Sequence, residues 1–70
     1  MNIKDIENLA KSRDAMREMA DTIDLILSMT MAQPDIEKMT LADQMKFVLL
    51  AGKLFEGMAN IDKYAKEMNP

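Results

Sequence analysis

Apolar side chains recur every three or four residues along most of the chain, which is the spacing of one face of an α-helix. In the first half this spacing defines a stripe that we expect to pack on another helix: Ile6, Leu9, Arg13, Met16, Ala20, Ile23 and Leu27. The opposite positions are charged and are expected to face solvent: Lys4, Glu7, Lys11, Asp14, Glu18 and Asp21. The pattern predicts a long amphipathic helix over residues 3–32, with Asn2 as its N-cap.

The helical pattern is interrupted once, near the middle of the chain. Pro34 cannot continue a helix and pushes the residue before it away from helical angles. Thr40 precedes the next apolar stretch, with an acid three residues later, which is a variant of the capping box. We therefore predict a short helical turn over residues 34–39 and a second long helix over residues 41–67, ended by Asn69 and Pro70.

The second half of the chain carries two apolar stripes instead of one. The first stripe is Phe47, Ala51, Leu54, Met58, Ile61, Ala65 and Met68. The second is rotated by about 120° from the first and comprises Leu41, Met45, Val48, Gly52, Phe55 and Ala59. A helix with two apolar stripes packs against two neighbours, and the first helix can cover only one of them. We therefore expect the second stripe to be an oligomer interface.

These elements predict an all-α fold: a single domain over residues 1–70 that forms an antiparallel helical hairpin. The uncovered stripe predicts assembly into a helical bundle, with a homodimer as the expected oligomer. Two glycines lie inside the second helix and cost about 1 kcal/mol each relative to alanine. We expect Gly52 to permit a close helix approach, and Gly57 to lie on the outer face, where it bends or weakens the helix.

The turn end of the hairpin is expected to be unusually apolar. Residues 25–31 and 41–51 present apolar side chains in nearly all directions, and the hairpin brings them together. The short turn covers only part of this surface, and the remainder exceeds the exposed patch that a soluble monomer tolerates. Nine methionines in the chain favour a surface that adapts to a partner, the alternative being a loosely specified helical core. The predicted partner-binding residues are Leu25, Met29, Met31, Ile36, Met39 and Leu50.

Composition argues against catalysis and against a cofactor or metal site. The chain has no cysteine and no histidine, and its hydroxyl groups occur in no nucleophile motif. Asp14, Glu18 and Asp21 share a helix face but lack calcium-loop spacing. A net charge of −3 disfavours nucleic acid as a partner. The apolar runs are too short for a membrane span, so we expect a cytoplasmic protein.

Arg13 is the most informative charged residue, because it occupies a position of the first apolar stripe. It is expected either to pair with Asp62 or to extend its charged end to the solvent at the rim, and to fix register between helices. Alternatively, Arg13 and Arg17 of several copies clamp an anionic ligand such as a nucleotide.

Two functions are predicted. The first is a non-catalytic, homo-oligomeric regulator or inhibitor of a partner protein, typical of small accessory proteins of phages and mobile elements. The alternative is an oligomeric binder that sequesters an anionic ligand.

Overall fold

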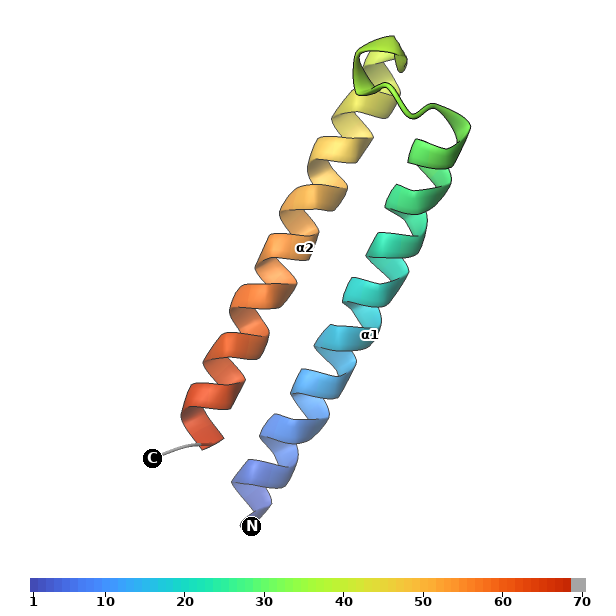
Figure 1. Cartoon of the computed structure of the whole chain (residues 1–70). Coiled ribbons are helices and arrows are strands. Elements are labelled where there is room, and N and C mark those ends of the chain that lie inside the picture. Colours follow the sequence, from blue (N-terminus) through green and yellow to red (C-terminus); the bar gives the residue numbers. More distant parts are fainter. Residues whose placement is uncertain (69–70) are drawn as a thin grey trace.

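A computed structural model describes residues 1–68 as two antiparallel helices joined by a short turn (Figure 1). Helix α1 spans Ile3–Ala32, the 3₁₀ helix η1 spans Ile36–Lys38, and α2 spans Leu41–Met68. The rod measures 50 × 15 × 14 Å between Cα atoms. The start of α1 and the end of α2 lie at one end, the open end, and η1 lies at the other, the turn end (Figure 1). The helical hairpin is confirmed, whereas Asn69 and Pro70 lie outside the described residues.

Local side-chain hydrogen bonds explain where the helices begin. The Asn2 side chain accepts a hydrogen bond from the Asp5 backbone N–H at 2.8 Å, and the Asp5 carboxylate accepts one from the Asn2 N–H at 3.4 Å. The Thr40 hydroxyl accepts a hydrogen bond from the N–H of the third helical residue of α2 at 3.1 Å. Each contact satisfies a donor that has no partner within the helix. Because these contacts are local, the helix starts could be predicted from sequence.

The hairpin seam, meaning the residues through which α1 and α2 face each other, follows a regular spacing of three and four. The least exposed positions that form this series in α1 are Asn8, Ser12, Ala15, Met19, Thr22, Ile26 and Met29. Those in α2 are Phe47, Leu50, Ala51, Leu54, Gly57, Ile61, Tyr64 and Met68. This alternation of three and four is the heptad spacing of two helices that pack along their length.

The predicted packing face of α1 was wrong. All residues of its most apolar stripe are exposed: Ile6, Leu9, Arg13, Met16, Ala20, Ile23 and Leu27. The residues that do face α2 lie one position earlier. Several of them are small or polar, as at Asn8, Ser12 and Thr22, although Met19, Ile26 and Met29 also lie in the seam. In α2 the prediction was better, although Met58 and Ala65 are exposed.

The hairpin on its own has almost no hydrophobic core. Met39, after η1, is the one buried apolar residue among residues 1–68, with 8% of its surface exposed. Asn8 and Thr22 are buried to 2% exposure. The Thr22 hydroxyl donates to the Glu18 carbonyl oxygen at 2.8 Å, whereas the Asn8 Nδ2 has no partner within the described part of the chain. Two helices alone cannot enclose a core, so packing stabilises this chain weakly.

The prediction for Gly57 was wrong, whereas a close approach at Gly52, which was expected at the oligomer interface, stays a prediction. Gly57 does not lie on the outer face: a Cβ atom built there would lie 2.7 Å from the Met19 Cγ across the seam. Nothing lies within 4 Å of a Cβ built on Gly52, so this chain contains no close helix approach there. The Met19 side chain in its present position therefore leaves no room for a Cβ atom at residue 57.

Candidate functional site

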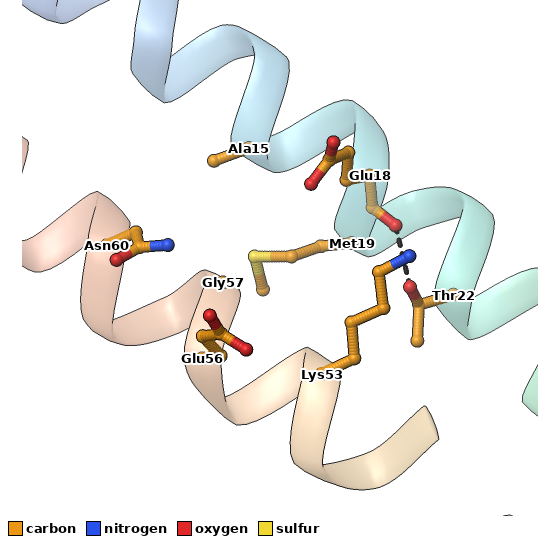
Figure 2. A pocket seen from close by; sticks show the side chains of 8 residues that line it. All are labelled: Ala15, Glu18, Met19, Thr22, Lys53, Glu56, Gly57 and Asn60. Carbon is orange, nitrogen blue, oxygen red and sulfur yellow. Dashed lines mark hydrogen bonds between the residues drawn. The ribbon is translucent and has the colours of Figure 1, made fainter. Parts of the chain in front are cut away.

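One flank of the hairpin is polar and slightly hollowed. A shallow pocket of about 120 Å³ lies there, lined by Ala15, Glu18, Met19, Thr22, Lys53, Glu56, Gly57 and Asn60 (Figure 2). A neighbouring hollow is lined by Lys11, Asp14, Ala15, Glu18, Asn60 and Tyr64. The charged members come from both helices, and several directly precede a seam residue, as Glu18 precedes Met19 and Lys53 precedes Leu54. Residues before the seam positions therefore face this polar flank.

The opposite flank is apolar. Successive residues of a helix are about 100° apart, so residues that directly follow a seam position face away from the polar flank. Between Asn8 and Leu27 of α1 these residues are Leu9, Arg13, Met16, Ala20, Ile23 and Leu27. On α2 they include Val48, Ala51, Phe55, Met58, Asp62 and Ala65. We call these twelve residues the apolar face. Its only charged members are Arg13 and Asp62, and all except Ala51 are exposed.

The predicted oligomer-interface residues are all exposed in the single chain: Leu41, Met45, Val48, Gly52, Phe55 and Ala59. Val48 and Phe55 belong to the apolar face. An open apolar groove next to it is lined by Leu41, Gln44, Met45, Val48 and Leu49. The interface role of these residues stays a prediction. What sequence reasoning missed is the contribution of α1, whose exposed stripe extends the same face across both helices.

The predicted partner-binding residues divide into two groups. Leu25, Met31 and Ile36 are exposed near the turn end, and we call them the turn-end surface. Met29 and Leu50 are half-buried in the hairpin seam, and Met39 is buried. Met29 and Leu50 lie between the two helices, and Met39 directly follows η1, so these three residues are covered by the chain itself. Binding of a partner here stays a prediction that concerns the three exposed residues.

The predicted pair between Arg13 and Asp62 is absent from the single chain. The Arg13 Nε donates to the Asp14 Oδ1 at 3.2 Å, and Asp62 instead accepts from the Lys66 Nζ at 2.9 Å. All four side chains are more than half exposed. Arg13 therefore lies on the apolar face and not in the seam. Arg17 is also exposed, and an anion contact through these arginines stays a prediction.

The described residues contain no group of three or more acids placed to hold a metal ion, and neither described helix is long and apolar enough to cross a membrane. No family model, no curated protein and no solved structure matches the chain. The chain's own surfaces carry the remaining evidence, and the apolar face and the turn-end surface both expose large apolar side chains.

Proposed function

We propose that this chain is a non-catalytic interaction protein that self-associates and acts as a regulator or inhibitor of a partner protein. One observation carries the proposal. Sixteen large apolar side chains are exposed within residues 1–68, against a single buried one. Apolar surface of this extent on a small protein is typical of a molecule that works by contact with other macromolecules.

Ten of these sixteen residues belong to two surfaces, seven to the apolar face and three to the turn-end surface. Two separate surfaces suit two different partners. The apolar face runs along both helices and matches the long contact that a second helical hairpin makes. The turn-end surface contains Met31, whose flexible thioether side chain adapts to the shape of a partner. We assign self-association to the first surface and binding of a target protein to the second.

A test of the target-binding role starts from a tagged chain, used to capture proteins from the native host. The captured candidate is then purified and titrated against wild-type, Met31→Lys and Asn60→Lys chains. Met31 is 80% exposed, so lysine there should leave the fold intact while placing a charge in the contact. Asn60 is exposed on the polar flank, far from the turn end. The Asn60→Lys substitution introduces the same residue there and is the matched control.

We expect Met31→Lys to weaken target binding by at least about tenfold, because a charge pressed into an apolar contact loses its hydration. Asn60→Lys should bind as the wild type does. Equal binding by all three chains would show that the target docks elsewhere. If no captured protein binds the chain again when both are purified, the proposed function would be contradicted.

A further inference from the structure

We propose that the apolar face is covered by the same face of a second copy, in a two-fold dimer whose turn ends lie together. In this dimer α1 of each copy packs against α2 of the other. The inference rests on the proposed function and deepens it, since it names the occupant of the face and fixes its orientation. Three observations carry it: the size of the face, its two charges and the volumes of its side chains.

The size of the apolar face suits one more hairpin. The rod is 50 Å long and 15 Å wide between Cα atoms. A plane of these dimensions has an area of about 750 Å², close to the roughly 800 Å² that each partner buries in a stable protein interface. A second copy of the chain offers a face of identical length, so the two faces can cover each other from end to end.

The two charges of the face lie at nearly the same height along the rod. Met19 of α1 lies opposite Gly57 of α2, which fixes the register of the hairpin. Six residues before Met19 is Arg13, and five residues after Gly57 is Asp62. In the single chain each charge bonds to a neighbour on its own helix. Covering the face takes both charges out of water, and a charge of opposite sign across the interface compensates for that lost hydration, whereas a like charge does not.

Symmetry leaves two ways to stack the faces. If the two-fold axis runs across the rod, the two turn ends lie at opposite ends of the dimer. A residue near the open end of one copy then faces a residue near the turn end of the other, and α1 packs on α1 and α2 on α2. Arg13 then meets only the α1 half of the other face, which contains no acid, and Asp62 meets the α2 half, which contains no base. If the axis runs along the rod, residues at the same distance from the turn end face each other, and α1 of each copy packs on α2 of the other. Arg13 of each copy then lies opposite Asp62 of the other copy, so the dimer contains two such pairs.

Side-chain volumes on the face agree with the second arrangement. At equal heights, Ala20 lies opposite Phe55 of the other copy, and Ile23 lies opposite Ala51. Leu9 near the open end is similarly opposite Ala65. A large side chain thus meets a small one at these three heights, which is how facing layers interdigitate at native packing density. At two further heights Met16 lies opposite Met58 and Leu27 opposite Val48, so large side chains meet there.

The decisive experiment uses the charge variants Arg13→Glu and Asp62→Arg. In each variant residues 13 and 62 carry charges of the same sign. They would face each other across the interface of its homodimer, so this dimer should dissociate. In an equimolar mixture every facing pair is again of opposite sign, so the two variants should form a heterodimer. One variant is labelled with ¹⁵N, and native mass spectrometry separates the heterodimer from both homodimers. We expect the dissociation constant of each variant alone to rise more than about tenfold, and that of the mixture to return to within about threefold of the wild type.

Each outcome decides the proposal. Variants that dimerise alone as the wild type does would show that these charges lie outside the interface, and the proposal would be wrong. A mixture that stays dissociated would exclude packing of α1 on α2 of the other copy. Both side chains are more than half exposed in the single chain, so the folds should tolerate the changes. The chain with both substitutions provides the folding control, because it should form its own homodimer.

A second measurement reads the orientation directly. The chain contains no cysteine, so a Glu37→Cys variant carries one nitroxide label, at the turn end. In the proposed dimer the two labels lie within about 30 Å, roughly two helix diameters plus the label linkers. In the arrangement with turn ends apart they would be separated by about the 50 Å length of the rod. That longer distance would overturn the orientation while leaving target binding at the turn-end surface untouched.

Discussion

Gly57 of α2 lies directly beneath the Met19 side chain of α1, at the centre of the hairpin. A Cβ atom on residue 57 would lie 2.7 Å from the Met19 Cγ and 3.2 Å from its Sδ. Figure 2 shows the thioether crossing from α1 towards this glycine. The missing side chain makes room for the methionine, so the two residues together fix how closely and at what register the helices pack.

Gly57→Ala is therefore expected to destabilise the protein, although alanine is the better helix former. The added Cβ forces a displacement that typically costs about 1–3 kcal/mol, against about 1 kcal/mol gained in helix propensity. We expect a net loss of about 1 kcal/mol in the free energy of unfolding, measured by urea denaturation. In the double variant Met19→Ala with Gly57→Ala, the shortened side chain at residue 19 should remove the clash. The stability lost by the double variant should therefore be smaller than the sum of the losses of the two single variants. Strict additivity would show that the contact is not what matters.

Gly52→Ala is the matched control and should have the opposite sign. Nothing lies within 4 Å of a Cβ built at this position, and the residue is exposed. Alanine there gains helix propensity without a clash, so we expect a stabilisation of about 1 kcal/mol in the same denaturation experiment. A clear destabilisation at Gly52 would reveal a close neighbour that the single chain does not contain.

Asn8→Leu should stabilise the hairpin. Asn8 is 2% exposed, and its Nδ2 has no hydrogen-bond partner among residues 1–68. Leucine has a similar shape, removes the unpaired donor and adds apolar contact, for an expected gain of about 1–2 kcal/mol. Thr22→Val is the comparison, because that equally buried hydroxyl is hydrogen-bonded to Glu18 and its loss should cost about 0.5–1 kcal/mol. A lower thermal midpoint for Asn8→Leu would mean that the amide is paired.

The sequence was sufficient to predict the hairpin because its signals are local. Asn2 and Thr40 carry the caps, and Pro34 ends the first helical pattern, so the bounds follow from neighbouring residues. Even the stripe of α2 around Phe47, Leu54 and Ile61 was placed correctly in the seam. Periodicity is strongest where large apolar side chains repeat, and in α2 one such stripe does face the other helix.

The packing face of α1 could not be predicted because hydrophobicity shows which residues avoid water and not which neighbour covers them. The stripe through Met16 and Ile23 is the most apolar, yet the seam uses Ala15, Met19 and Thr22. One signal was present: Ser12 and Ala15 are two small residues three positions apart, and Thr22 follows Ala15 by one heptad. A second uncovered stripe in α2 pointed to an interface, but only the structure revealed that α1 contributes to the same face.

The mass of the particle in solution tests the central claim, that the apolar face is covered by another copy. One chain has a mass of 8.0 kDa. At micromolar concentration, light scattering should give twice that mass for the wild type. Ile23→Asp, which places a charge in the middle of the apolar face, should return the particle to 8.0 kDa. Ser28→Asp, an exposed substitution outside that face, should leave the dimer intact. A helical wild-type protein with the mass of one chain would contradict the account.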